Sequence, residues 1–418
     1  MSNLIKPDIK FIKEIIGSGG ESLKRCYQCA TCSVKCSLSG DKDPFPRKEM
    51  IKAQWGMKKE LLASPDIWLC HQCRDCTTYC PRGAKPSEVL SAIRRLTIVH
   101  YGFPGFLARL VNQPKFLPLL LLIPTLLLGF AILVREDIEK SLGISEQVSQ
   151  KIVFASTTIF PHWLLNTFFA SLSTLVFIAL FVGVIRFWLA MKHADGNRRP
   201  AKGIVSSILT AIKNIIMHNN FAECSTERLR FLSHSSVFFG FIALSVVAIW
   251  VITAPINPLF QKGLVYPFNF FSPLKIIANL GGVAIIGGCL LMIYSRLKED
   301  STSTYFDWAF IGTLFCVVAS GFATEFLHYV RIDELRYPVY FAHLVFVSML
   351  LFYLPYSKFS HLIYRTVAMV YAEYSGRSSG VPGKPEDEEK VFTQNLGELA
   401  KKLDTDLQRM NTEEIFRH

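Results

Sequence analysis

Six long apolar stretches occupy most of the chain after its first hundred residues. They cover residues 116–134, 163–185, 235–253, 274–294, 305–327 and 337–356. Each is close to the ~20 residues that a helix needs to cross the hydrocarbon core of a membrane. The first stretch contains Pro118 and Pro124, which membrane helices tolerate. The pattern therefore predicts a bundle of six membrane-spanning helices.

The residues before the first stretch have the mixed polarity of a water-soluble helical domain. The pattern predicts a turn and a helix over residues 47–62. It predicts a basic amphipathic helix over residues 86–101, which carries Arg94 and Arg95. Pro104-Gly105 then interrupts the chain. The sequence thus predicts an all-α protein with three parts, which are a first domain over residues 1–103, a membrane domain over 104–372 and a polar tail over 373–418.

A further amphipathic segment lies between the second and third apolar stretches. Its apolar residues recur at helical spacing at positions 204, 205, 208, 209, 212, 215 and 216. Two interpretations stay open for this segment. It is either a helix that lies on the membrane surface or a helix that docks on a partner.

The charge distribution predicts how the bundle is oriented. Half of the residues are hydrophobic, and the formal net charge is +12. The basic residues concentrate between positions 191 and 230, whereas the segment 254–273 contains only Lys262 and the segment 135–161 is net acidic. Basic loops stay in the cytoplasm, so we expect a multi-pass protein of the cytoplasmic membrane with both termini inside. The positive charge therefore indicates orientation first, and no nucleic acid is expected as a partner.

Eight of the eleven cysteines form two runs with identical spacing. The runs are Cys26-x2-Cys29-x2-Cys32-x3-Cys36 and Cys70-x2-Cys73-x2-Cys76-x3-Cys80, and Pro81 follows the second. This is the bacterial ferredoxin pattern for two [4Fe–4S] clusters. Zinc sites need only separated Cys-x2-Cys pairs, and disulfides give no reason for two identical runs. The motif therefore predicts two clusters in a reducing, cytoplasmic compartment.

The ferredoxin pattern also implies which cysteine binds which cluster. In that pattern the fourth cysteine of each run ligates the cluster of the other run. The expected ligands of one cluster are Cys26, Cys29, Cys32 and Cys80, and those of the other are Cys70, Cys73, Cys76 and Cys36. Ser37 stands where a proline is usual, which does not affect ligation.

Histidines in the apolar half are candidate ligands of haem b, which commonly carries electrons across a membrane. Polar groups within a membrane are costly and therefore tend to be functional. His343 and His361 are 18 residues apart, so on one continuous helix they would share a face about 27 Å apart. That spacing suits two stacked haems, one near each membrane surface.

The positions of the other histidines suggest how these ligands pair. His234 begins the third apolar helix, and we expect it to pair with His361 at an inner haem. His343 needs an outer partner, for which His328 and His162 are both candidates. Two alternatives stay open. His328, one turn after Glu325, could instead serve quinone protonation, and either candidate could simply anchor at the headgroup interface.

These motifs together resemble a known fusion. The cysteine domain resembles the small cluster subunit of heterodisulfide reductase, and the membrane part resembles the gamma subunit of respiratory nitrate reductase. The fusion resembles the C subunits of the quinone-interacting membrane-bound oxidoreductase complexes of sulfur metabolism. The matching features are the two cysteine runs, Arg228-x-Arg230-x3-His234 and the segment 356–361. The nitrate reductase relative has a second histidine on the third helix, where this chain has Leu244.

The resemblance implies a membrane electron-transfer role. Electrons would pass between menaquinone and two flavin and iron–sulfur partner subunits, which in turn exchange electrons with adenylylsulfate reductase. The expected cofactors are two [4Fe–4S] clusters and two haems b. We expect the electrons to leave through a basic face around Arg74, Arg82, Arg94 and Arg95.

Three alternative functions stay open at this point. One is an enzyme of the heterodisulfide reductase type, which is disfavoured because adjacent cysteine pairs are absent from the sequence. Another is the membrane subunit of a sulfite-reductase-linked complex, against which the fused ferredoxin domain argues. The third is a non-redox membrane anchor whose clusters are only structural.

Overall fold

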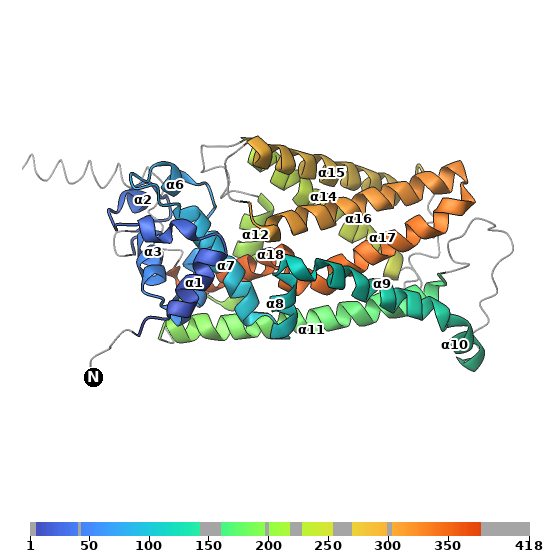
Figure 1. Ribbon diagram of the computed structural model, residues 1–418, viewed down its shortest axis with the longest axis horizontal. Helices are drawn as coiled ribbons and strands as arrows, with labels where there is room; N and C mark the ends of the chain where they lie inside the picture. The colour runs from blue at the N-terminus through green and yellow to red at the C-terminus, as the bar shows by residue number, and fades with distance from the viewer. Residues whose placement is uncertain are drawn as a thin grey trace, which may run out of the picture.

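The computed structural model describes residues 6–40, 43–142, 160–196, 200–217, 228–253, 270–298 and 303–377. Within these ranges all regular secondary structure is helical, and they contain no strand. A small helical domain lies at one end of a long helical bundle (Figure 1). The predicted all-α class, with its cluster domain and six apolar helices, is therefore confirmed.

The first domain consists of short helices wrapped around one longer helix. They are α1 (Ile9–Gly17), η1 (Glu21–Arg25), α2 (Thr31–Val34), α3 (Arg47–Gln54), α4 (Lys58–Leu62), α5 (Asp66–Leu69), α6 (Asp75–Thr78) and α7 (Pro86–Tyr101). The longer helix, α7, has the bounds that its amphipathic pattern predicts. Its buried residues, Val89, Leu90 and Ile93, pack against the shorter helices.

The remaining helices form the bundle and its connections. They are α8 (Gly105–Val111), η2 (Pro114–Phe116), α9 (Leu117–Leu133), α10 (Arg135–Leu142), α11 (His162–Ala194), α12 (Ile204–Met217), α14 (Arg228–Thr253), α15 (Pro273–Lys298), α16 (Tyr305–Val330), α17 (Asp333–Tyr353), η5 (Leu354–Tyr356), η6 (Lys358–Ser360) and α18 (His361–Ser375).

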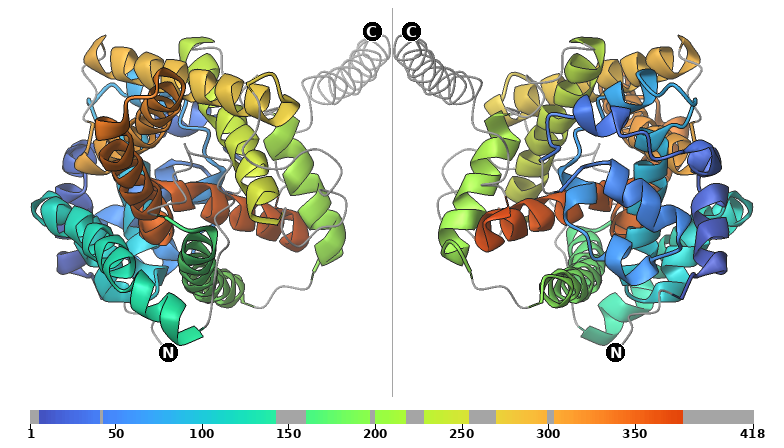
Figure 2. Two further views of the ribbon diagram at one scale, coloured as in Figure 1. Left: turned by 90° about the vertical axis from the view of Figure 1, so that its right-hand side faces the viewer. Right: turned by 90° about the vertical axis from the view of Figure 1, so that its left-hand side faces the viewer.

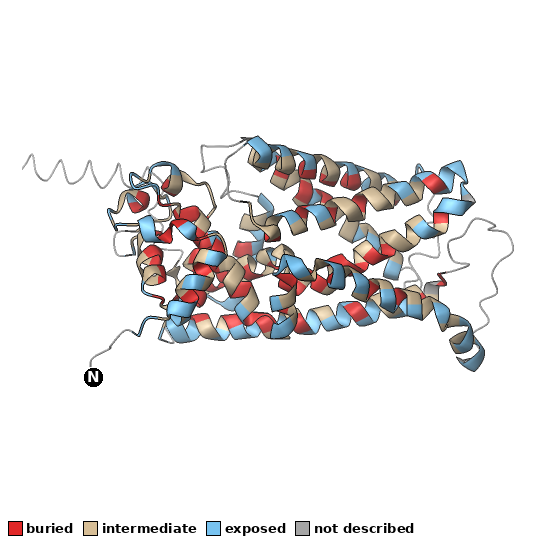
Figure 3. Cartoon of the chain, in the orientation of Figure 1, coloured by how far each residue is buried: buried red, intermediate tan, exposed pale blue. Residues whose placement is uncertain are grey.

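Six of these helices are long and apolar enough to cross a membrane. They are α9, α11, α14, α15, α16 and α17, one for each predicted stretch. Many large apolar side chains on their outer faces are exposed, for example Phe130 and Phe177, at 65% and 68% (Figure 3). An exposed apolar surface of this kind is what a lipid-facing helix presents.

Close contact between glycines brings α14 and α15 together. A Cβ added at Gly240 would lie 2.6 Å from the carbonyl oxygen of Gly281. A Cβ added at Gly288 would lie 2.8 Å from the carbonyl oxygen of Ser233. Small residues allow membrane helices to approach this closely. Leu244 packs into the apolar cluster at this contact.

The last apolar helix does not continue to His361, and this corrects the predicted common face of His343 and His361. Helix α17 ends at Tyr353, and two 3-10 turns separate it from α18. Pro355 has no backbone N–H to extend the helix, and Ser357 is fully extended with a ψ of −178°. Helix α18 therefore lies across the end of the bundle (Figure 2).

The first domain and the bundle share one hydrophobic core. Trp68 from α5 stacks on Tyr364 from α18, with ring centroids 5.5 Å apart. Phe187, near the end of α11, lies edge-on to Trp68 at 6.3 Å and is fully buried. Helix α11 reaches this core because it continues to Ala194, beyond the predicted end at residue 185.

Charged side chains connect the end of α15, the start of α16 and η6. Thr304 and Asp307 form a capping box that begins α16. Asp307 also accepts a hydrogen bond from Lys358 in η6 and lies 3.8 Å from Arg296 of α15. These contacts fix η6 and therefore the start of α18, where His361 lies.

Helix α12 packs on α18 with its small residues and turns its apolar residues outward. Ser207 and Ala211 are fully buried, whereas Val205 and Leu209 are 66% and 64% exposed. Lys202, just before the helix, pairs with Glu373 of α18 at 2.6 Å. Membrane surface and partner remain the two predicted environments for the exposed face.

Candidate iron–sulfur and haem sites

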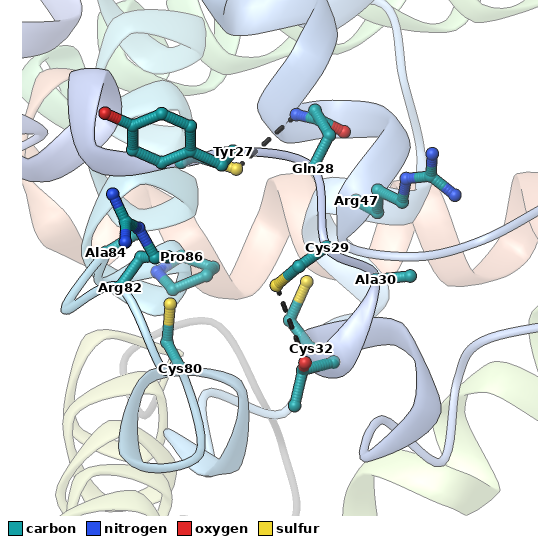
Figure 4. Close-up of a pocket in the computed structure, with 12 residues that line it drawn as sticks. Tyr27, Gln28, Cys29, Ala30, Cys32, Arg47, Cys80, Arg82, Ala84 and Pro86 are labelled. Carbon is teal, nitrogen blue, oxygen red and sulfur yellow. Dashed lines mark hydrogen bonds between the residues drawn. The ribbon is translucent and has the colours of Figure 1, made fainter.

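The cysteines of the two runs line two cavities, and each cavity receives cysteines from both runs. The first cavity is lined by Cys26, Cys29, Cys32 and Cys80 (Figure 4). The second is lined by Cys36, Cys70, Cys73 and Cys76. The structure thus brings together the two groups of four that the crossed ferredoxin pattern implies. Ligation of iron by these groups remains a prediction.

The two cysteine loops have the same unusual backbone conformation. Gln28 and Ala30 in the first loop have φ angles of 60° and 69°, and Gln72 and Arg74 in the second have 60° and 70°. Residues other than glycine rarely adopt positive φ, and such strain persists only where the surroundings require it. Turns of this kind form concavities of backbone N–H groups that bind anions, as iron–sulfur clusters require.

The arrangement of sulfurs fits clusters better than single metal ions. In the ranges that the structure describes, no three His, Cys, Asp or Glu side chains are close enough to hold one metal ion. A cubane presents a separate iron atom to each thiolate, so its four ligands stand further apart. The ten described cysteines are also free of disulfides, and Cys224 lies outside the described residues.

Burial weakens the acidity of two thiols in the second cavity, those of Cys36 and Cys76. It raises the pKa of Cys36 to about 12 and raises the pKa of Cys76 as well. By contrast, a hydrogen bond with the Thr31 hydroxyl lowers the pKa of Cys29, which is exposed. Because cluster ligands are thiolates, assembly of the second cluster must release protons from buried thiols.

Two arginines connect the second cavity to its surroundings. Arg94 of α7 donates to the Cys70 carbonyl at 2.7 Å and to Gln72 Oε1 at 3.1 Å. Arg365 of α18 donates to the same carbonyl at 3.1 Å and to His71 Nδ1 at 3.3 Å. Burial, together with these two cations, lowers the pKa of His71 to about 4, so its neutral ring can accept that bond.

Arg365 was not identified from the sequence, although its distance of four residues from His361 could have indicated a shared helix face. It lies four residues after His361, on the same face of α18. One end of this short helix therefore carries a candidate haem ligand, and its next turn contacts the backbone of a candidate cluster ligand.

The charges of His361 and His234 interact, and the shared binding of an inner haem by this pair remains a prediction. Burial lowers the pKa of His361 to about 3, and the neighbouring charge of His234 contributes to the decrease. His361 Nδ1 lies 2.7 Å from the Lys358 carbonyl oxygen and must donate to it. A histidine held in this way carries its lone pair on Nε2, which is the form that binds a metal.

His343 has a similar arrangement further along the bundle. Its Nδ1 lies 3.1 Å from the Val317 carbonyl oxygen and 3.1 Å from Ser320 Oγ, both on α16. Its ring also lies against Gly321, where an added Cβ would be 3.2 Å from Cε1. The ring orientation therefore fits a haem ligand that would bind through Nε2.

The second ligand beside His343 remains a prediction. His328 lies eight residues after Ser320 on α16, which is about 12 Å along the helix, and its ring is edge-on to Tyr329. His162 is the first residue of α11, and its side chain is outside the described part of the chain.

The predicted exit face is partly wrong. Arg94 points inward to the second cavity, as described above. Arg95 donates to the side chain and carbonyl of Asn112, at 3.1 and 2.6 Å, so it joins α7 to α8. A basic amphipathic helix usually exposes its cations, but here both guanidiniums satisfy buried carbonyl groups. Arg82 alone of the four predicted arginines is exposed.

Comparison with known proteins identifies the first domain. Residues 22–84 match the 4Fe-4S dicluster domain family. The C subunit of the H(2):CoB-CoM heterodisulfide,ferredoxin reductase of Methanothermobacter marburgensis is 38% identical over 88 residues, which cover 21% of this chain and 47% of the relative. A protein of Archaeoglobus profundus described as similar to the C subunit of heterodisulfide reductase is 39% identical over 101 residues, covering 24% of this chain and 52% of the relative.

A longer match extends into the membrane helices. Citrate utilization protein B of Escherichia coli is 27% identical over 337 residues, which cover 75% of this chain and 84% of the relative. The chain spans about half the length of the heterodisulfide reductase relatives that it matches. No solved structure matches the chain. The N-terminal 4Fe-4S dicluster domain is thus homologous to the C subunit of heterodisulfide reductase.

Proposed function

We propose that this protein is the membrane electron-transfer subunit of a complex. It passes electrons between menaquinol and cytoplasmic flavin and iron–sulfur subunits, which are linked to adenylylsulfate reductase. Its cofactors are two [4Fe–4S] clusters and two haems b, and the cluster domain faces the cytoplasm. The observation that carries the proposal is the continuity of α18, which connects His361 to Cys70 through Arg365.

The chain's own residues supply sites for each group. The two cysteine cavities hold the clusters, whose role is to take up and release single electrons. His234 and His361 would hold the inner haem, and His343 would hold the outer one together with His328 or His162. The carbonyls of Lys358 and Val317 orient His361 and His343 by accepting from Nδ1. All of these residues act by binding and orientation, and no side chain need react covalently.

Polar residues near the start of α15 and the end of α16 suit the quinol. These helix ends lie away from the cluster domain (Figure 1). Glu325 of α16 lies 2.9 Å from Lys275 Nζ and accepts from Asn279 Nδ2 at 3.1 Å, both on α15. An acidic side chain next to a lysine within a membrane helix is costly, which favours a functional role. Glu325 would accept a proton as menaquinol is oxidised.

Anaerobic reduction tests the proposal. The purified protein is mixed with a menaquinol analogue, the haem b absorption band is followed, and cluster reduction is measured by electron paramagnetic resonance. We expect fast haem reduction followed by cluster reduction, and loss of cluster reduction in His361→Ala. The matched control is His193→Ala, because His193 is exposed near the end of α11. Protein purified without haem b would overturn the proposal and favour the anchor function.

The long match to Citrate utilization protein B supports a second candidate. In that case the same electron route would serve the use of citrate instead of sulfur compounds. Deletion of the gene separates the two candidates. Loss of growth on citrate favours the second, and loss of growth with sulfate as electron acceptor favours the first.

A further inference from the structure

The first cysteine cavity includes an exposed cysteine, whereas the four cysteines of the second cavity are buried or half-buried. Cys29 is exposed. Tyr27, which follows Cys26, is 68% exposed, and Tyr79, which precedes Cys80, is 54% exposed. Val34, in the helix after the first loop, is 82% exposed. The second cavity is instead approached by Arg94 and by Arg365 from α18. The first cavity is therefore the one that a redox partner in the cytoplasm can approach.

Basic side chains surround these exposed rings. The Arg82 guanidinium lies 4.2 Å from the centre of the Tyr27 ring, and Lys35 Nζ lies 4.8 Å from that of Tyr79. The Arg25 side chain lies near Gly83, the residue that follows Arg82, because a Cβ added at Gly83 would be 3.9 Å from Arg25 Nη1. We define the basic aromatic face as Lys24, Arg25, Tyr27, Val34, Lys35, Tyr79 and Arg82. Glu21, an exposed acidic residue, lies three positions before Lys24 in the sequence.

We propose that the basic aromatic face docks an acidic redox protein, which exchanges electrons with the cluster held by Cys26, Cys29, Cys32 and Cys80. This proposal rests on the proposed function and names the surface and the charge of its cytoplasmic partner. The partner carries a ring of carboxylates around an apolar centre that contacts Tyr27, Val34 and Tyr79.

Three physical arguments support this partner. Clustered cations attract an acidic protein and speed its association at low salt. Tyrosine and arginine are the residues most enriched among those that dominate binding energy. The cations are already held over the aromatic rings, so little side-chain freedom is lost when they meet carboxylates.

An acidic flavodoxin serves as the probe because the natural partner is not identified. Its binding to the full chain in lipid nanodiscs is measured by calorimetry at low and high salt. The variants are Arg82→Glu and Lys35→Glu, and the matched control is Lys59→Glu. Lys59 is an exposed lysine on α4 that lines neither cavity. Iron content confirms that each variant retains its clusters.

We expect saturable binding that weakens as salt increases, and a Kd about tenfold higher in Arg82→Glu and in Lys35→Glu than in the control. Absence of saturable binding overturns the proposal, and so does an equal effect of Lys59→Glu. The acidic run at residues 386–389 of the chain itself is a rival occupant. If the full chain shows no saturable binding and the variant that ends at Arg377 does bind flavodoxin, that run occupies the face in the full chain and the proposal fails.

This test is independent of the quinol reaction. Cluster reduction by the menaquinol analogue is measured separately on the unaltered protein. If quinol fails to reduce the clusters while the charge variants still weaken flavodoxin binding, the proposed function falls and the docking face stands. If quinol reduces the clusters and the variants have no effect on binding, only the docking face is overturned.

Discussion

The Arg365 guanidinium donates a hydrogen bond of 3.1 Å to the backbone carbonyl of Cys70. Arg365 belongs to α18, which begins at His361, and Cys70 begins the second cysteine run. The two residues are 295 positions apart in the chain. This single contact therefore joins the proposed inner haem site to the proposed cluster nearest the membrane domain.

Replacing Arg365 should change the potential of one cluster selectively. Arg365→Met removes a cation and a donor beside the second cavity, so the reduced, more negative cluster is stabilised less. We expect its midpoint potential to fall by about 60 mV, which is one tenfold change in a one-electron equilibrium. A redox titration followed by electron paramagnetic resonance measures the change. Arg365→Lys keeps the charge, so it should lower the midpoint potential by less than Arg365→Met does. An equal decrease in the potentials of both clusters would contradict the placement of Arg365 beside the second cluster alone.

The fourth cysteine of each run should support the cluster of the other run. Cys80→Ser should disturb the cluster held by the first run, and Cys36→Ser the cluster held by the second, because each lines the opposite cavity. Iron analysis and electron paramagnetic resonance of the two variants measure which cluster remains. If Cys80→Ser altered the spectrum of the cluster that depends on Cys73, ligation would follow each run separately.

His234 and His361 should be equivalent in haem binding. Because they are proposed to hold one haem together, His234→Ala, His361→Ala and the double variant should each lose the same single haem. The pyridine haemochrome assay measures haem per protein. His343→Ala should leave that inner haem in place. A double variant that loses twice as much haem as either single variant would show that the two histidines bind different haems.

Glu49 should make the cluster domain less stable as pH rises. Its side chain is fully buried, neither carboxyl oxygen has a hydrogen-bond partner within the described residues, and burial raises its pKa to about 8 from 4.5. Because the folded state binds this proton more tightly, stability should fall by about 1.4 kcal/mol per pH unit as pH rises from 4.5 to 8.

The variant Glu49→Gln tests this expectation. Glutamine does not ionise, so the stability of Glu49→Gln should not fall between pH 5 and pH 8. The difference in stability between this variant and the unaltered protein should therefore increase steadily over that range. The temperature at which the cluster absorbance bleaches is the measurement. Glu60→Gln, at an exposed position of α4, is the control. Parallel pH profiles of Glu49→Gln and the unaltered protein would show that Glu49 is ionised without cost.

The sequence predicted the helices well because their signals are local. Long apolar runs define the six bundle helices, and the amphipathic period of residues 86–101 reproduces α7. The helix predictions need only the period of neighbouring residues. Which thiols share a cavity was implied by the ferredoxin pattern that the cysteine runs match.

The sequence could not predict how those helices meet. Membrane helices tolerate proline, so Pro355 did not exclude a helix that continues to His361. The extended backbone at Ser357 depends on how η6 is held by Asp307, 50 residues earlier. Arg94 and Arg95 were interpreted as surface cations for a similar reason, since the carbonyls of Cys70 and Asn112 that they bind come from distant segments.

The core shared by Trp68, Phe187 and Tyr364 has a consequence for how the two halves work together. A fragment that ended at residue 103 would present Trp68 to water, so the cluster domain is not a separable carrier that diffuses to the membrane. Two sites in one covalent chain do not have to meet by diffusion, so electron exchange between them is intramolecular. The rate of electron exchange across this junction should therefore be independent of protein concentration, whereas exchange at the opposite, exposed end should vary with the concentration of the partner.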